Sequence, residues 1–204
     1  MHTITFKNTI SLLLGLCFFA TGTFAQTVKV TVDKPDFDDF PSPELGGNTG
    51  EKNWEPLDWL EAEVKLKVEA RPEPKDGYVD SLTIRWYVAV EDPAGKGFFL
   101  LEKEVDYVNV RLDEDVYASV YLSPAAIRRL TGGDRAGKSA VWGVAGEVSY
   151  NGAKVAEFSS KSTKEWWRSN KLSRSDKFPL RSKSETPFKF LWWDRYLQEK
   201  EPRR

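Results

Sequence analysis

The residues most suggestive of chemistry are Gly132 to Ser139, which satisfy the phosphate-binding pattern GxxxxGK[ST]. In a P-loop this pattern follows a strand and opens a helix, whose N-terminal amides hold the phosphates. Here a short helix is expected before the pattern and a strand after it. Because the order of the elements is reversed, we expect a loop that joins helix to strand and binds no nucleotide cofactor.

Carboxylates offer two other chemistries. Asp36, Asp38 and Asp39 supply the oxygen atoms that calcium prefers, but the run lacks the full calcium-loop spacing with its distal Glu. Asp113 and Asp115 could serve as the carboxylate pair of a glycosidase, a hydrolase that needs neither His nor Cys. Acidic loops and turns are common in β proteins, so we expect solvated loops, no catalytic residue, no metal site and no enzyme activity.

Residues 1–25 have the features of a secretory signal peptide. An apolar run, Ile10–Ala20, is followed by small residues that permit cleavage after Ala25. The run is well short of the roughly 20 residues that cross a bilayer. We expect export to the periplasm, the outer membrane or the cell surface, with no transmembrane segment in the mature chain.

Cleavage would remove His2 and Cys17, the only His and the only Cys in the chain. The mature protein could then hold no Ser/His/Asp or Cys/His catalytic site, no disulfide, and no zinc site built on His or Cys. This is the main reason to expect a binding protein.

Charge is distributed unevenly although the formal net charge is −1. The segment Asp33–Asp58 has eight acidic and two basic residues, whereas Lys161–Arg204 has thirteen basic and six acidic residues. A dipolar chain of this kind suits electrostatic docking, either to itself or to a partner.

Alternating apolar and polar residues predict about seven strands, which is typical of an all-β sandwich. One short helix, Ala125–Leu130, is expected before the sixth strand, with Ser123 as its N-cap and Gly132 at its end. The predicted strands are Thr27–Thr31, Leu60–Ala70, Ser81–Glu91, Phe98–Leu112, Val116–Leu122, Ala140–Tyr150 and Ala153–Ser159. The segment Phe37–Pro56 is expected to be a Pro/Gly/acid-rich connection.

Two strands have irregular patterns. In Phe98–Leu112 the alternation changes phase, which predicts a bulge or a break near Tyr107. In the hairpin around Asn151-Gly152, pairing of Val148 with Val155 places Glu157 opposite Gly146, so a bulge is an open possibility there.

Eight Trp residues raise the question of carbohydrate binding, because flat aromatic faces bury the apolar faces of sugars. Trp86 and Trp142 are expected on inward strand faces, in the core. Trp54 and Trp59 are the candidates for a glycan site, and Trp166 and Trp167 could also bind a sugar. The carbohydrate-binding module is therefore the alternative function.

The C-terminal arm, residues 161–204, is basic and aromatic, and its segment Phe188–Leu197 is expected to be partly helical. Basic aromatic segments also bind nucleic acid, but export argues against that partner. So many aromatic side chains are costly to leave in water, so the arm either folds back on the sandwich or docks on another subunit. The candidates for partner binding are Trp166, Trp167, Phe188, Phe190, Trp192, Trp193 and Tyr196.

The strand SLTIRWYVAV, with Trp86 at its centre, is similar to the third strand of immunoglobulin-like domains. Over Leu57–Trp167, the chain resembles exported immunoglobulin-like proteins of Verrucomicrobia encoded beside type IV pilus-like assembly genes, in the segments DWLEAEVKLKV, YVDSLTIRWYVAV, SPAAIRRLTGG and VWGVAGEVSYNGAKVAEF. The resemblance implies an immunoglobulin-like sandwich at 26–160 and a non-catalytic role in a pilus-like or outer-membrane assembly. Its partners would be envelope or pilus-assembly proteins, or further copies of the chain.

Overall fold

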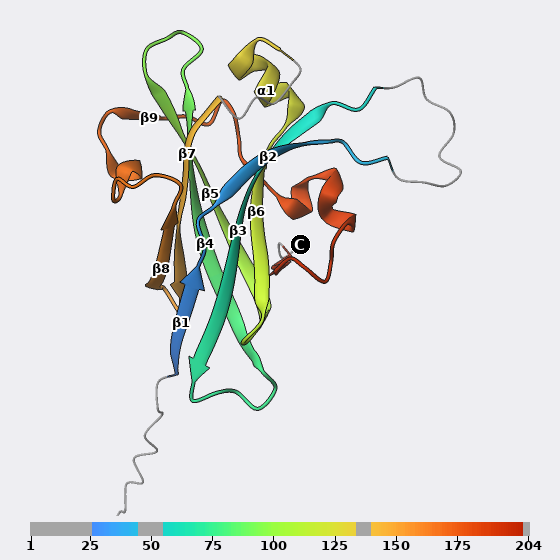
Figure 1. Cartoon of the computed structure of the whole chain (residues 1–204), viewed down its shortest axis with the longest axis vertical. Coiled ribbons are helices and arrows are strands. Elements are labelled where there is room, and N and C mark those ends of the chain that lie inside the picture. Colours follow the sequence, from blue (N-terminus) through green and yellow to red (C-terminus); the bar gives the residue numbers. More distant parts are fainter. Residues whose placement is uncertain (1–25, 45–54, 134–139, 202–204) are drawn as a thin grey trace, which may run out of the picture.

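The computed structural model describes residues 26–44, 55–133 and 140–201, and its two β-sheets pack face to face (Figure 1). Sheet A has the order β1-β3-β6-β10 with β2 also paired to β3, and sheet B has the order β11-β5-β4-β7-β8 with β9 also paired to β5. This confirms the predicted all-β sandwich. The signal-peptide prediction for residues 1–25 lies outside the described residues.

The strands of the sandwich proper are β1 Thr27–Val32, β2 Asp36–Pro41, β3 Asp58–Arg71, β4 Tyr78–Glu91, β5 Phe98–Arg111, β6 Asp115–Leu122, β7 Val141–Tyr150 and β8 Ala153–Ser159, with helix α1 Pro124–Thr131 before β7. The arm contains the short strands β9 Leu172–Arg174, β10 Arg181–Ser182 and β11 Gln198–Glu199, and the 3₁₀ helices η2 Trp166–Arg168, η3 Lys183–Glu185 and η4 Pro187–Phe190.

The core lies between the sheets and is built from alternate residues of the long strands. Val68 of β3 and Ile84 and Trp86 of β4 are completely buried there. The Trp86 ring meets the Phe158 ring edge-on, with 5.0 Å between centroids. Burial of apolar surface on this scale is the main stabilising contribution of a domain without disulfides.

Helix α1 begins and ends as the sequence predicts. The Ser123 side chain accepts a hydrogen bond from the Ala126 amide, and Gly132 closes the helix with a left-handed φ of 75°. The P-loop look-alike therefore starts at a helix end and leads into β7, although residues 134–139 lie outside the described residues. In the described part of the chain, the next element after the pattern is strand β7, whereas a P-loop leads into an α-helix whose N-terminus holds the phosphates.

Strand β5 changes phase without the predicted bulge or break. It stays continuous and pairs with β4 in one register from Tyr78↔Arg111 to Glu91↔Phe98. The prediction is wrong because Asn109 adopts a left-handed φ of 52°, which changes the face presented by the residues that follow.

The β7–β8 hairpin contains the bulge that the sequence left open. Asn151 and Gly152 form the turn with φ values of 49° and 77°, as expected for a two-residue hairpin loop. The register then shifts between Val148 and Ser149, so Val148 pairs with Ala156 and Gly146 with Phe158. The simple pairing of Val148 with Val155 is wrong for that reason.

Trp142 does not lie in the main core, so that prediction is also wrong. A second irregularity, opposite Ala89 and Val90 of β4, shifts the register of β7. Trp142 consequently packs on the outer face of sheet B, beside Trp166 and Phe98. Two local patterns that look alike in sequence therefore put Trp86 inside and Trp142 outside.

The acidic segment contains a strand that the sequence did not predict. Strand β2 pairs antiparallel with the first part of β3, from Asp36↔Glu63 to Pro41↔Asp58. Most of this strand, residues 37–41, falls in the segment expected to be a Pro/Gly/acid-rich connection, because acidic residues and Pro are uncommon in strands. Pairing with the long neighbour β3 overrides that preference.

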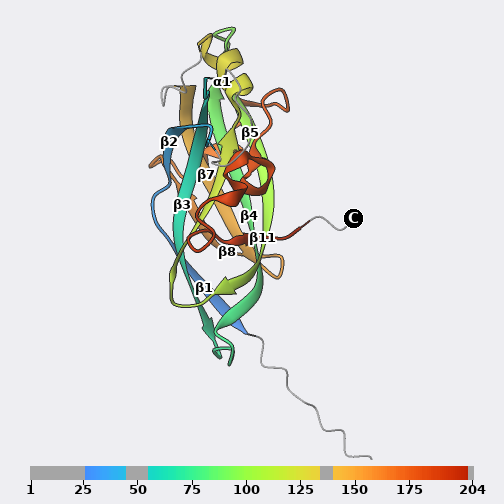
Figure 2. The same cartoon turned by 90° about the vertical axis from the view of Figure 1, so that its right-hand side faces the viewer.

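The arm folds back over the open side of the sandwich, where β5 and β6 are the last long strands of their sheets (Figure 2). Strands β9 and β11 pair with β5, and β10 pairs with β6. Phe178, Leu180 and Leu197 complete the main core. The arm is therefore hydrogen-bonded to both sheets and contributes to their shared core.

The arm has no continuous helix over Phe188–Leu197. Its helical content is three 3₁₀ helices, of which η4 ends at Phe190. Trp192 then takes a left-handed φ of 56°, which is incompatible with continuing a helix. Among the described residues, no helix has the length and apolar character needed to cross a membrane.

Candidate functional site

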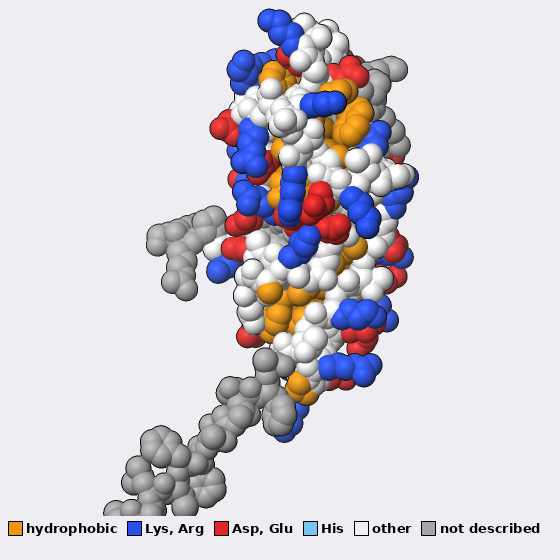
Figure 3. Space-filling model, turned by 90° about the vertical axis from the view of Figure 1, so that its left-hand side faces the viewer, with side chains coloured by type: hydrophobic (Ala, Val, Ile, Leu, Met, Phe, Trp, Pro, Cys, Tyr) orange, Lys and Arg blue, Asp and Glu red, His pale blue; other side chains and the backbone are white. Residues whose placement is uncertain are grey.

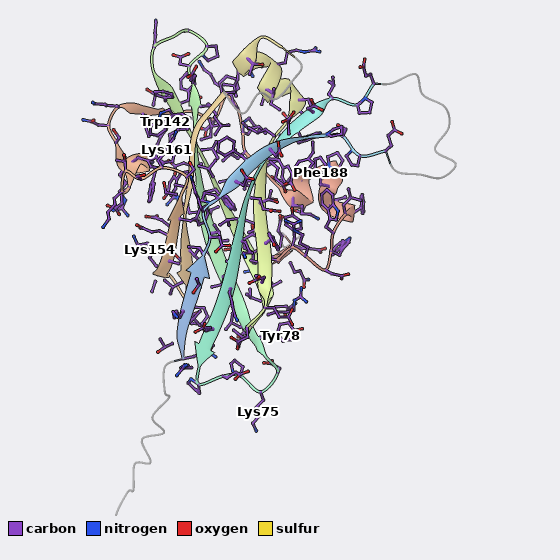
Figure 4. All side chains as sticks on the ribbon, viewed as in Figure 1. Lys75, Tyr78, Trp142, Lys154, Lys161 and Phe188 are labelled. Carbon is purple, nitrogen blue, oxygen red and sulfur yellow. The ribbon has the colours of Figure 1, made fainter. Side chains whose placement is uncertain are left out.

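The candidate site lies on the outer face of sheet A, where the arm covers β3 and β6. Alternate residues of a strand point to the same face, so Glu61 and Glu63 of β3 and Tyr121 of β6 project away from the core. The arm segment 183–197 packs over them. Figure 4 shows Phe188 from this segment beside the two strands.

Glu61 is the centre of a buried hydrogen-bond network. Its carboxylate accepts hydrogen bonds from the hydroxyls of Tyr121 and of Tyr196, the latter at 3.0 Å. Burial raises the pKa of Glu61, and the nearby charge of Glu63 acts in the same direction, whereas the tyrosine hydroxyls partly offset both. A buried carboxylate with hydroxyl partners specifies the position of the residues that supply those hydroxyls.

Glu63 anchors the last turn of the arm. Arg195 Nη2 lies 2.7 Å from Glu63 Oε1, and the Tyr196 hydroxyl shares its single proton between Glu61 and the other carboxylate oxygen of Glu63. The Arg195 guanidinium also lies 3.9 Å from the centroid of the Tyr117 ring. Backbone hydrogen bonds of Tyr117 to residues 195 and 197 complete the attachment.

Lys183 is an unusual buried cation at the start of η3. Its Nζ donates a 2.5 Å hydrogen bond to the carbonyl of Leu191 and lies 5.0 Å from the centroid of the Tyr196 ring. Burial lowers the pKa of Lys183, while the carboxylates of Glu199 and Glu61 oppose that shift. The side chain thus ties η3 to the turn that follows η4.

Phe188 is the aromatic base of the arm. Its side chain is buried. The ring stacks on the rings of Tyr121 and Trp192, with 5.2 Å and 6.3 Å between centroids. It also meets the Trp59 ring edge-on, with 6.1 Å between centroids. Trp192 also contacts Phe40 of β2, at 6.4 Å. These ring contacts fix Trp192 against both the arm and the acidic strand.

Beyond this base the arm exposes large aromatic side chains. In the described part of the chain five large hydrophobic side chains are exposed, and three of them are Phe190 at 55%, Trp192 at 47% and Trp193 at 67%. We call Phe190 and Trp192 the arm surface. Trp193 lines a separate groove, described below.

The structure separates the other candidates for partner binding from this surface. Trp166 and Trp167 are buried on the outer face of sheet B, and Phe188 is buried under the arm. Tyr196 is partly buried in the glutamate network. Sequence reasoning could not separate them because all seven side chains are aromatic and lie in one basic segment.

Trp59, the glycan candidate that the structure describes, does not form an open platform. Trp59 is partly buried against Phe188, and its indole nitrogen donates to the Ser42 hydroxyl at 3.0 Å. Trp54 lies outside the described residues. The remaining Trp side chains must therefore be judged by their own surroundings.

The outer face of sheet B has a small aromatic core of its own. Trp142 meets Trp166 edge-on at 5.2 Å, and Trp167 stacks on Tyr87 at 5.6 Å. The ammonium of Lys161 lies 4.9 Å from the Trp142 ring, and Figure 4 shows the two side chains close together. Trp166 and Trp167 thus attach the beginning of the arm to the sandwich.

Three carboxylates beside this core are close enough to share a metal ion: Glu147, Glu157 and Glu165. Basic side chains already pair with them. Lys154 lies 2.8 Å from Glu157, and Arg168 lies 2.8 Å from Glu147 and 3.0 Å from Glu165. Acidic and basic side chains alternate on this side of the molecule in Figure 3.

The pKa of Glu147 supports an ion-pair network at this place. Burial would raise it, but hydrogen bonds from Arg168 and Tyr87, with the charges of Arg168 and Lys154, outweigh burial and lower it. A carboxylate held ionised by fixed cations needs no metal ion for neutralisation.

The acidic residues proposed for calcium or hydrolysis are spread out. Asp36, Asp38 and Asp39 are exposed along β2, where neighbouring residues face opposite sides of the strand. Asp113 lies 3.9 Å from Lys67, and Asp115 lies 3.6 Å from Lys65. These aspartates therefore do not form a cluster that could hold calcium or act as a pair of catalytic carboxylates.

Comparison with known proteins identifies a protein family and a similar solved structure. A model of a pilus-associated protein family matches residues 21–203. A crystal structure of a protein from Akkermansia muciniphila, of the Verrucomicrobia, is similar with a TM-score of 0.83 and 37% identity, covering 88% of this chain and 96% of that one. No curated protein matches.

Proposed function

Because this chain belongs to a family of pilus-associated proteins, we propose that it is an exported, non-catalytic protein that binds other subunits of a type IV pilus-like or outer-membrane assembly. We also propose that it is encoded beside the genes of that assembly. The observation that supports the binding role is the arm surface: Phe190 and Trp192 are exposed, and Trp192 is stacked on buried Phe188.

The arm surface is preorganised for binding. Trp192 is stacked on buried Phe188, which is stacked on Tyr121, and Arg195 and Tyr196 attach the turn that follows to the glutamates of β3. A surface already ordered in the free protein loses less conformational entropy on association. Exposed Trp and Phe side chains are also the types that dominate binding energy when a partner buries them.

Charges around the arm surface indicate what a partner must offer. Exposed Asp38 and Asp39 lie on β2, whose Phe40 contacts Trp192. On the other side, the ammonium of Lys189 lies 4.6 Å from the Phe190 ring. A protein subunit with an apolar patch between a basic and an acidic edge would match this arrangement.

The test is site-specific photo-crosslinking in intact cell envelopes. A photoreactive amino acid replaces Phe190, and the matched control carries it at Lys75, an exposed residue in the distant β3–β4 turn (Figure 4). We expect position 190 to crosslink to one pilus-like or outer-membrane subunit, or to a second copy, identified by mass spectrometry.

The same products from both positions, or none from position 190, would overturn the proposal. The double variant Phe190→Ala/Trp192→Ala should leave folding intact because both side chains are exposed. Deletion of 161–204 is a poor test, since it also removes Leu180 and Leu197 from the core.

A further inference from the structure

A groove of about 470 Å³ lies between the arm and the strands β4 and β5. It is lined by Tyr78 of β4, Asn109 and Arg111 of β5, and Trp193, Asp194 and Gln198 of the arm. This volume is within the range of about 300–1,000 Å³ that small-molecule sites occupy. The groove is separate from the arm surface in the residues that form it.

Two exposed aromatic side chains line the groove. Trp193 is 67% exposed and Tyr78 is 42% exposed. The left-handed φ of Trp192 separates the two neighbouring indoles, so that Trp192 stacks back on Phe188 while Trp193 lines the groove. A left-handed φ is unfavourable for a non-glycine residue, and here the strained turn presents an indole to the groove.

The polar side chains of the groove are held in place before any ligand binds. Asn109 Nδ2 donates to Gln198 Oε1 at 3.0 Å, which leaves the Asn109 carbonyl oxygen and the Gln198 amide nitrogen to bind a ligand. Arg111 donates to the Asp194 carbonyl at 2.6 Å and pairs with Glu114 at 2.9 Å. Asn109 itself has a left-handed φ of 52°.

The charges of the groove are balanced. Arg111 is the one cation and Asp194 the one carboxylate among the lining residues, and Glu114 already pairs with the guanidinium. An anionic ligand would have to compete with Glu114. A ligand with an apolar face and several hydroxyl groups would instead match the aromatic rings and the amides.

We propose that this groove binds a neutral saccharide. The apolar face of a sugar ring stacks on Trp193 or Tyr78, and its hydroxyls exchange hydrogen bonds with the Asn109–Gln198 amide pair and with Arg111. This activity is independent of the assembly role, which uses Phe190 and Trp192. It also assigns sugar recognition to residues other than Trp54 and Trp59.

The test uses the mature chain, residues 26–204, on an array of neutral, sialylated and sulfated oligosaccharides, followed by titration calorimetry with the strongest neutral oligosaccharide of the array. We expect saturable binding of neutral saccharides. Trp193→Ala and Tyr78→Ala should each weaken it about tenfold or more, a loss of about 1.4 kcal/mol. Asn109→Gly, which tolerates the left-handed φ, should weaken it without disrupting the backbone of β5.

Phe190→Ala is the matched control, because it removes an exposed aromatic side chain outside the groove, and it should bind the saccharide like the unaltered chain. An array without signal, binding of charged glycans alone, or full binding by Trp193→Ala would each overturn the proposal. Thermal unfolding of every variant checks that a loss of binding is not a loss of fold. Failure here would leave the crosslinking result at position 190 unaffected.

Discussion

Gly146 offers the sharpest test of the packing in this sandwich. It lies in β7 opposite Phe158 of β8, and a Cβ added to it would lie 2.3 Å from Cζ of the Phe158 ring, 2.7 Å from Cε1 and 2.9 Å from Cε2. The ring cannot simply move away, because it also packs edge-on against buried Trp86. Gly146→Ala should therefore strain the centre of the core.

The expected cost follows from two contributions. Forcing an extra methyl group into a packed core costs about 1–3 kcal/mol. Displacing Phe158 from Trp86 loses an edge-on aromatic contact worth about 0.5–1.5 kcal/mol. We expect Gly146→Ala to lower the free energy of unfolding by about 1.5–4.5 kcal/mol, a large share of the ~5–15 kcal/mol of a typical domain.

The assay is urea unfolding followed by both tryptophan fluorescence and circular dichroism, in two backgrounds. Phe158→Leu removes the three ring atoms that the new Cβ would meet. In that background we expect Gly146→Ala to cost no more than about 0.5 kcal/mol, since reducing the freedom of the unfolded chain at a glycine is stabilising. The coupling energy of the double-mutant cycle should then be at least about 1 kcal/mol.

Gly143→Ala is the comparison on the same strand. Its added Cβ would lie 3.2 Å from a Trp166 ring carbon and 3.3 Å from Cγ of flexible Lys161, so a cost below about 1 kcal/mol is expected. Equal costs of Gly146→Ala in the two Phe158 backgrounds would refute the reasoning, because the hairpin register would then not place the ring over the glycine.

Three further predictions concern the network, the turn and the arm. Burial raises the pKa of Glu61 above its ordinary value of 4.5. Between these two pKa values the folded protein binds more protons than the unfolded one, so the free energy of unfolding should fall as the pH rises through this window. Urea unfolding measured against pH should show this fall, and Glu61→Gln should remove it. Asn151 has a left-handed φ of 49°, so Asn151→Ala should cost about 1 kcal/mol and Asn151→Gly much less, by the midpoint of urea unfolding; equal costs would contradict a strained turn. Leu180→Ala should lower the free energy of unfolding by about 2–5 kcal/mol because Leu180 is buried in the shared core. Trp193→Ala should change it by no more than about 0.5 kcal/mol in the same assay, because Trp193 is exposed. Similar values for the two variants would contradict the packing of the arm.

Much of the fold follows from local patterns in the sequence. The side-chain period of two predicted β3 and β4 because every second residue of each strand packs in the main core, although Tyr87 and Ala89 of β4 are also buried on the other face. The caps of α1 and the Asn151-Gly152 turn were predictable because each depends on the conformation of only a few neighbouring residues.

The candidate sites were less predictable, since their residues come from distant parts of the chain. The sequence indicated that the basic aromatic arm matters, but it did not distinguish buried Trp167 from exposed Trp193. The exposure of Trp193 depends on the left-handed φ of Trp192. An aromatic residue rarely adopts this conformation, so the sequence gives no reason to expect it there. Glu61 likewise looked like one of several polar residues on a strand face until Tyr121 and Tyr196 covered it.

The sequence by itself therefore determined the sandwich, its hairpin, its short helix and the absence of His and Cys beyond residue 25, because these depend on residue type and on short-range periodicity. Tertiary structure alone decided that Trp142 faces outward, that β2 pairs with β3, and that the arm leaves Phe190, Trp192 and Trp193 exposed. The physical reason is that a bulge, a strand partner and a burying surface are all supplied by residues far away in the chain, and the local pattern carries no record of them.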